Sequence, residues 1–442
     1  MNATLVRARI IHTPRDPFRE GGAVLESFDD GGLAFDGEGR ILATGDFAAV
    51  RKEHPAAELI DARDALLLPG LVDTHVHWPQ LGIVGAMGLE LLDWLRVRTL
   101  PEEARLSEPG YARALARDFV RGLAANGTTT ALVFGSHFPE AQEIFFAEAE
   151  RSGLRIASGL VVSDRDLLPE LHRTPDAAYD AGRELALRWH GRGRLRYAVT
   201  PRFSLSCSDG MLESCGALEK EVDGALVTTH LNENEDEVRA VGDRFPWSSD
   251  YLETYERHGL VGPSTVLAHD VHATDAELAR LAQARASVAH CPSSNAFLGS
   301  GIFPMRRHLE HAVHFALGSD VGAGTGLSLF KEGVLAQQAQ MLAPGGCRLG
   351  PAHLLWLATR AGAEALGLGD ELGDLAPGKA ADYVLVRPPA GGTLEAALQR
   401  TESPEQALGA VFALAREESV AEVRVAGERP ALGPDYGAGK AP

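Results

Sequence analysis

The sequence predicts an α/β fold: a (β/α)₈ TIM barrel that carries a small β-sandwich built from both termini. Three observations support this prediction. The 442 residues are too many for one ordinary domain with a single hydrophobic core. The middle of the chain alternates short apolar runs with helix-like stretches, which is typical of βα repeats. The two ends of the chain instead contain strand-like runs separated by turn signals.

The two ends supply the runs from which we expect the sandwich. Turn residues separate these runs, as they do between the strands of a small sheet. We therefore expect residues 1–68 and 372–442 to form the two parts of the sandwich, and residues 69–371 to form the barrel. The N-terminal runs are TLVRARII, GGLAFD, GRILATG, AELIDA and ALLLPG, and the C-terminal ones are GDLAPGKAADYVLVRP, ALGAVFALA and SVAEVRVAGE.

The middle contains eight strand-like runs, each ending in a polar cluster. Helix-like stretches such as TDAELARLAQAR lie between them, and Thr274 with Glu277 has the spacing of a capping box. Eight alternations favour a barrel. An open doubly wound sheet is the alternative, but no G-x-G-x-x-G follows a strand. The runs are GLVDTHVH, TTTALVFGS, RIASGLVVSD, RYAVTPRFSL, ALVTTHLNE, TVLAHDVH, ASVAHCPSSN and HFALGSDVG.

Composition narrows the possible partners and location. The formal net charge of -19 makes nucleic acid a poor partner. No uncharged apolar stretch reaches the roughly 18 residues of a membrane span. The four cysteines form no C-x-x-C pair and give no reason to expect a disulfide framework. The N-terminus lacks the apolar run of a signal peptide, so we expect a cytoplasmic protein.

Histidine and aspartate residues fall where a barrel carries its active groups. Side chains at the C-terminal ends of barrel strands converge on one mouth. His75 and His77 end the first run, His230 ends the fifth, His269 lies near the end of the sixth, and Asp320 ends the eighth. Alternate residues of a strand share a face, so His75 and His77 can reach one ion. Imidazole with carboxylate suits zinc or iron. The sequence thus predicts a metal-dependent hydrolase.

The same positions carry a family resemblance. PGLVDTHVHWPQ, THLNENEDEV, LAHDVH and GSDVG resemble the amidohydrolase superfamily of barrel metal hydrolases. Its two-metal members bridge the ions with a carboxylated lysine at the end of the fourth strand. Here that strand ends VTPRFSLSCSD, and no lysine lies between Lys52 and Lys220. We therefore expect one metal per chain, Zn²⁺ with Fe²⁺ as the alternative, and Asp320 acting as both ligand and base.

Glu233 is the predicted proton shuttle. It follows His230 in His-Leu-Asn-Glu, where it can lie past the strand end, beside the attacking water. The alternative is a solvated acid in the run NENEDE. An acid beside a metal fits hydrolytic deamination of a purine-like ring. The zinc deaminases that use H-x-E with P-C-x-x-C are excluded, because that signature is absent.

A narrower resemblance spans residues 69–340. HVHWPQ, LLDWLRVRTLPEEARL, VTPRFSLSC, THLNENEDEV and AHCPSSNAFLGSG resemble the guanine deaminase family. This resemblance implies conversion of guanine to xanthine and ammonia, by a homodimer. It also implies that Gln80, Arg202 and Phe203 hold the purine and that Leu81 to Arg105 cover the site. Arg202 offers fixed donors for an O6/N7 edge, Phe203 a ring to stack on, and Gln80 both a donor and an acceptor.

Some positions depart from the family, and other functions stay open. Asp270 stands where the family usually has glycine, and Ala323 and Gly326 replace the more usual residues after Asp320. The alternative substrates are another aminated heterocycle (8-oxoguanine, a pterin, a triazine) or a cyclic amide. A non-catalytic metal-dependent binding protein is a third possibility, which the intact Glu233 and Asp320 oppose. His137, His272 and His290 lie near the mouth, and we interpret them as structural.

Overall fold

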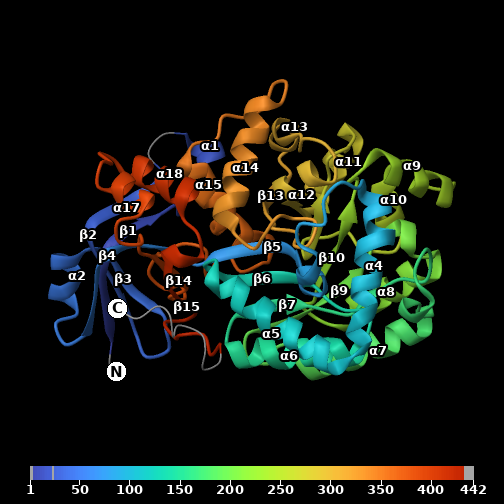
Figure 1. Cartoon of the computed structure of the whole chain (residues 1–442), viewed down its shortest axis with the longest axis horizontal. Coiled ribbons are helices and arrows are strands. Elements are labelled where there is room, and N and C mark those ends of the chain that lie inside the picture. The colour runs from blue at the N-terminus through green and yellow to red at the C-terminus, as the bar shows by residue number, and fades with distance from the viewer. Residues whose placement is uncertain (1–2, 22–23, 433–442) are drawn as a thin grey trace.

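The computed structural model describes residues 3–21 and 24–432. It shows a barrel of parallel strands and helices beside a smaller sheet made from both ends of the chain (Figure 1). The blue N-terminal and red C-terminal segments lie together at one side of the barrel (Figure 1). This arrangement confirms the predicted α/β fold with a terminal β unit.

The eight predicted barrel runs all form strands. The third run is split into β7 and β8 at Gly159, where a side chain would collide with the carbonyl oxygen of Ala198. Neighbouring strands pair in parallel along the order β5-β6-β7-β9-β10-β11-β12-β13, and β8 pairs with β9. The strands are β5 (Leu71–His77), β6 (Thr128–Phe134), β7 (Arg155–Ser158), β8 (Val161–Val162), β9 (Leu195–Pro201), β10 (Leu226–Leu231), β11 (Thr265–His269), β12 (Ser287–His290) and β13 (His314–Leu317).

Two main-chain hydrogen bonds join the two ends of this sheet. The N–H of Asp320 donates to the carbonyl of His75 over 2.8 Å, and the N–H of His77 donates to the carbonyl of Val321 over 2.8 Å. The segment after β13 therefore lies alongside β5. This contact brings Asp320 next to the two histidines of the first barrel strand.

Helices surround the barrel, because each buries an apolar face. In α5, for example, Phe119 and Leu123 are fully buried. The predicted capping box at Thr274 and Glu277 is present at the start of α11. The helices of this part are α5 (Pro109–Ala125), α6 (Pro139–Ser152), α7 (Pro175–Trp189), α8 (Asp209–Glu221), α9 (Glu235–Arg244), α10 (Tyr251–Glu256), α11 (Asp275–Ala284), α12 (Pro292–Phe297), α13 (Met305–Glu310), α14 (Leu329–Leu342), α15 (Pro351–Ala358) and α16 (Arg360–Ala365).

The smaller unit is a six-stranded sheet in the order β15-β14-β4-β1-β2-β3. Its strands form one continuous hydrogen-bonded path, in which β1 and β4 are parallel and the other pairs are antiparallel. AELIDA and ALLLPG belong to the single strand β4. The short helices α1 (Pro17–Glu20) and α2 (Phe47–Glu53) accompany it. The strands are β1 (Thr4–His12), β2 (Glu26–Phe35), β3 (Ile41–Asp46), β4 (Glu58–Pro69), β14 (Tyr383–Val386) and β15 (Val420–Arg424).

One C-terminal prediction is wrong. ALGAVFALA was expected in the β-rich tail, but it lies in helix α18 (Pro404–Leu414), after α17 (Thr393–Leu398). The Ser403 hydroxyl accepts a hydrogen bond from the Gln406 N–H, and Pro404 occupies the first helical turn, where proline is favoured. These signals start a helix, and Leu408 and Phe412 bury its apolar face.

The predicted domain limits at residues 68/69 and 371/372 stay a prediction. β4 ends at Pro69 and β5 begins at Leu71, so the chain passes from the sheet to the barrel within two residues. Within the described residues, no helix is both long and apolar enough to cross a membrane.

Candidate metal centre and adjoining cavity

The five predicted metal ligands lie together at one end of the barrel. His75 and His77 lie at the C-terminal end of strand β5. His230 is the next-to-last residue of β10, and His269 is the last residue of β11. Asp320 lies beyond β13, which ends at Leu317, in the segment paired with β5. Positions separated by almost the whole barrel thus converge, as the sequence predicts.

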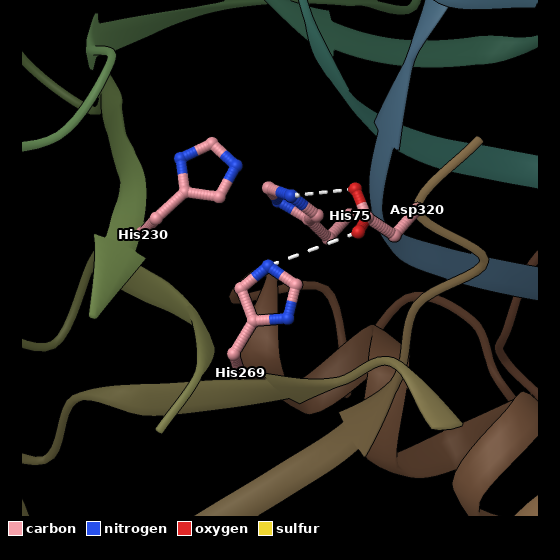
Figure 2. Close-up of side chains that lie close together, drawn as sticks. All are labelled: His75, His230, His269 and Asp320. Carbon is pink, nitrogen blue, oxygen red and sulfur yellow. Dashed lines mark ion pairs between the residues drawn. The ribbon is translucent and has the colours of Figure 1, made fainter. Parts of the chain in front are cut away.

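The donor atoms of these residues are closely spaced. The ligand atoms of His75, His230, His269 and Asp320 all lie within 4.8 Å of one another, and Figure 2 shows these side chains pointing toward one another. His77 Nε2 lies 3.1 Å from both His75 Nε2 and Asp320 Oδ1. The distance from His230 Nε2 to His77 Nε2 is 3.3 Å. Nitrogens that share one ion at about 2.0–2.1 Å are themselves about 3 Å apart.

The chemistry of this cluster fits a metal site. Burial lowers the pKa of His77 to about 4 and the pKa of His230 well below its usual range, so both rings are neutral and offer lone pairs. Burial alone would raise the pKa of Asp320, but hydrogen bonds from His75 and His77 hold it well below its usual range. His269 Nε2 is buried without a hydrogen-bond partner among the described residues. Neutral imidazoles around an ionised carboxylate are a suitable ligand set for a cation.

Neighbouring groups orient two of the histidines. His230 Nδ1 lies 2.6 Å from the carbonyl oxygen of Arg202, and His269 Nδ1 lies 2.9 Å from Asn295 Oδ1. Each oxygen accepts a hydrogen bond from the Nδ1–H group, so the Nε2 lone pair faces the metal site. The sequence offered no signal for the role of Asn295, since it lies in a different element, α12.

A cavity opens beside the donor cluster. Leu91, Trp94 and Leu95 of the predicted cover segment (residues 81–105) form its apolar wall with Leu298 and Ala323. The cover segment consists of short helical pieces: η1 (Trp78–Ile83), α3 (Leu91–Trp94), the π-helical turn η2 (Leu95–Thr99), α4 (Leu100–Ala104) and η3 (Arg105–Ser107). The polar lining residues are His77, Gln80, Arg202, His230, Glu233, His269 and Asp320.

Glu233 lies in this cavity beside the donor cluster. Its Oε2 is 3.5 Å from His269 Nε2, and it lies just after β10. Burial raises its pKa well above the usual range, and the nearby Glu237 and Asp320 carboxylates add to this effect. The main-chain N–H of Glu233 donates to Glu237, which also forms the capping box of α9 with the N-cap residue Asn234. Glu233 is therefore a fixed, buried acid rather than a solvated one, whereas Glu235 is exposed.

The predicted purine-binding residues meet at one wall of the cavity. Arg202 and Gln80 are buried and both line the cavity. Both are held by Glu103 of α4, which the sequence analysis missed. Phe203 also lines the cavity, with its ring centroid 6.3 Å from that of His230. Glu103 gave no signal in the sequence, because nothing distinguishes it from Glu102 in LPEEARL.

Other noted residues lie around this centre. The His137 Nε2 lies 3.3 Å from Glu103 Oε2. The unusual Asp270 is fully buried, where its Oδ2 lies 2.9 Å from His308 Nε2 and its Oδ1 accepts a hydrogen bond from Asn232. Asp270 does not line the cavity. It joins the loops after β10 and β11, the strands that carry His230 and His269.

Comparisons with known proteins agree with this geometry. Residues 66–429 match the Amidohydrolase family. The chain is 54% identical to a probable guanine deaminase of Deinococcus radiodurans over 428 residues, which cover 96% of this chain and 97% of the relative. Guanine deaminase from Bradyrhizobium japonicum has a similar structure, with a TM-score of 0.92, 33% identity and coverage of 97% and 99% of the two chains. The enzyme from C. acetobutylicum, solved with guanine in its active site, gives a TM-score of 0.89 at 25% identity, covering 97% of this chain and all of that one (100%).

Proposed function

This chain belongs to the amidohydrolase family, and we propose that it hydrolyses guanine to xanthine and ammonia. One observation carries the proposal. The buried Glu233, the imidazole and carboxylate groups that could hold a metal ion, and the polar side chains of Gln80 and Arg202 meet at one cavity, in a chain similar to guanine deaminases over nearly its whole length. Hydrolysis replaces the amino group on the guanine ring with an oxygen from water.

The ligand set supports one zinc ion held by His75, His77, His230, His269 and Asp320. Imidazole and carboxylate without thiolate also suit Fe²⁺, so the metal is part of the proposal. A bound ion of this kind lowers the pKa of its water to about 7 and so supplies a nucleophile at neutral pH. Proton transfer and purine binding are the tasks that we assign to the protein's own side chains.

Glu233 is the proposed proton carrier. Its buried carboxyl has a raised pKa, so it carries a proton that it donates to the ring nitrogen beside the reacting carbon. Asp320 stays ionised because its pKa is held low, and it accepts a proton from the attacking water. As the carbon–nitrogen bond breaks, the amino group takes that proton and leaves as ammonia, and the proton of the new hydroxyl group returns to Glu233.

Arg202, Gln80 and Phe203 are the proposed purine-binding residues. A guanidinium presents donors in a fixed plane, which matches the O6/N7 edge of guanine. Phe203 offers a ring face for stacking. The apolar wall of Leu91, Trp94 and Leu95 excludes water from the other side. A flat aromatic base with a polar edge fits such a cavity.

Turnover with guanine tests the function directly. Metal-loaded protein should release ammonia in step with the loss of guanine ultraviolet absorbance. The same assay with 8-oxoguanine, a pterin, an aminated triazine and a cyclic amide tests the alternative substrates. No turnover of guanine by protein with a full complement of metal would overturn the proposal.

The quaternary state and the compartment are part of the same proposal: a cytoplasmic homodimer. The four cysteines are free and buried, as expected in a reducing compartment. Met87 and Leu342 are exposed large apolar side chains of the kind that a subunit interface covers. Light scattering on the purified protein tests the dimer.

A further inference from the structure

One carboxylate holds both polar residues of the proposed purine site. Glu103 Oε1 accepts a hydrogen bond from Gln80 Nε2 at 2.9 Å, and Glu103 Oε2 accepts one from Arg202 Nη1 at 2.6 Å. His137 Nε2 lies 3.3 Å from the same Oε2. Three donors of different chemistry thus converge on one side chain that is itself 3% exposed. Glu103 is not among the residues that line the cavity, so it acts on a ligand only through them.

Glu103 fixes how Gln80 presents its amide. Gln80 Oε1 accepts a hydrogen bond from the Gly322 N–H at 3.2 Å, while Gln80 Nε2 donates to Glu103. An amide whose oxygen is held at one end and whose nitrogen is held at the other has only one orientation. Gln80 Nε2 also lies 3.2 Å from His77 Nδ1. Without the carboxylate, the amide nitrogen therefore loses one of its two partners, and the amide is held less firmly on the side that faces Arg202.

The same carboxylate neutralises and aims Arg202. The Arg202 side chain is 4% exposed, and a charge at this depth is costly unless it is paired. Arg202 uses Nη1 for Glu103, and the described residues give no hydrogen bond to its Nη2 or Nε. Those two donors remain for a ligand in the cavity that Arg202 lines. Burial alone would raise the pKa of Glu103, but Arg202 and His137 hold it well below its usual range, so the carboxylate is charged.

The position of Glu103 follows from the shape of the cover segment. An α-helix turns by about 100° per residue. The π-helical turn Leu95–Thr99 adds one residue to the path from α3 to α4, which brings Glu103 to the same face as Leu91 and Leu95. One face of this stretch therefore supplies both the apolar wall and the carboxylate behind the polar wall.

We propose that Glu103 is a positioning residue for deamination. It holds Arg202 and Gln80 in the positions in which they bind the purine. This inference rests on the proposed function. It also makes the cover segment a part of substrate recognition rather than only a lid. Removal of Glu103 should therefore weaken the binding of a purine more than it slows the chemical step.

Three variants separate positioning from stability. Glu103→Gln keeps the size of the side chain but removes the charge and one acceptor. Glu103→Asp keeps the charge on a stem one methylene shorter. Glu102→Gln is the matched control, since Glu102 is a buried carboxylate on the same helix that contacts Tyr111 and Arg105 instead. Melting temperature and metal content are measured for each variant.

The readouts are KM and kcat for guanine, together with the Kd for hypoxanthine, which keeps the O6/N7 edge and has no amine to lose. A misplacement of about 1 Å costs roughly a hundredfold in rate. We expect kcat/KM of Glu103→Gln to fall by about that factor, mainly through KM, with a parallel weakening of hypoxanthine binding. Glu103→Asp should lose about tenfold, while Glu102→Gln stays within about threefold of the parent.

Two results would overturn the inference. One is parental KM and hypoxanthine affinity in Glu103→Gln, or in Glu103→Asp if the first variant does not fold. The other is an equal loss in Glu102→Gln. If the parent itself does not turn over guanine, the proposed function fails separately. The crystal structure of Glu103→Gln then decides the inference, because Arg202 and Gln80 left in their parental positions would contradict it.

Discussion

Asn295 Oδ1 lies 2.9 Å from His269 Nδ1 and accepts a hydrogen bond from it. This hydrogen bond directs Nε2, the opposite nitrogen of the ring, toward the metal site. Loss of such an orienting partner costs about 10–100-fold in metal affinity. We expect Asn295→Leu, which keeps the volume, to weaken metal binding by about that factor. Competition against a chelator measures it. Asn295→Asp retains an acceptor and serves as the control. Parental affinity in Asn295→Leu would contradict the assigned role.

The buried Glu233 gives the sharpest prediction about catalysis. Glu233→Gln keeps the shape but cannot carry a proton, so we expect kcat to fall by about 10²–10⁴-fold. Metal content should stay at the parental value, as measured by elemental analysis. Glu235→Gln is the control, because Glu235 is an exposed acid in the same run. Retained turnover in Glu233→Gln would show that another group carries the proton.

The buried His12 side chain should make the free energy of unfolding depend on pH. Burial lowers its pKa to about 4 from 6.5, and its Nδ1 accepts a hydrogen bond from the Leu375 N–H at 3.3 Å. The unfolded chain therefore binds a proton at His12 before the folded chain does. The stability from this group is complete above about pH 6.5 and is lost as the pH falls toward 4, by about 3 kcal/mol.

Urea unfolding at pH 7 and at pH 4.5 measures this loss. His12→Asn keeps an acceptor for the Leu375 N–H but does not titrate, so its stability should fall less on acidification than that of the parent. His172→Asn is the control, because His172 is exposed. An equal acid loss in the parent and His12→Asn would place the titration elsewhere.

The N-cap of α18 predicts a local contribution to stability. The Ser403 hydroxyl accepts a hydrogen bond from the Gln406 N–H at 3.2 Å. Ser403→Ala should lower the free energy of unfolding by about 1 kcal/mol, measured by urea titration, because it leaves that donor without its partner. Ser403→Asp restores an acceptor and should recover most of the loss. No change in Ser403→Ala would mean that this helix start is frayed.

These residues show which parts of the structure a sequence can reveal. The barrel strands were predictable because each alternation of run and helix is local. The metal-site histidines were predictable because barrel topology brings strand ends together wherever they lie in the chain. The strand prediction for ALGAVFALA was wrong, because a short apolar run is compatible with a strand or with a buried helix. The roles of Glu103 and Asn295 were not predicted, for a different reason. Glu103 lies 99 residues from Arg202, and only the folded cover segment brings them together.

Asp270 and His308 form a buried pair, and we expect their contributions to the free energy of unfolding to be coupled. Asp270 Oδ2 lies 2.9 Å from His308 Nε2, and both side chains are fully buried. Asp270 has a positive φ of 46°, a conformation that asparagine also tolerates. Asp270→Asn therefore replaces one carboxylate oxygen with an amide group without straining the backbone. A buried polar group left without its hydrogen-bond partner costs about 1–3 kcal/mol.

A double-mutant cycle tests whether the pair itself is responsible. Asp270→Asn, His308→Leu and the double variant are compared by urea unfolding. If the two side chains stabilise each other, the double variant should be more stable than the sum of the single losses allows, by about 1–3 kcal/mol. Additive losses would mean that each residue acts through its other neighbours, such as Asn232. Metal content should fall with stability in Asp270→Asn, since Asp270 joins the loops that follow the strands of His230 and His269.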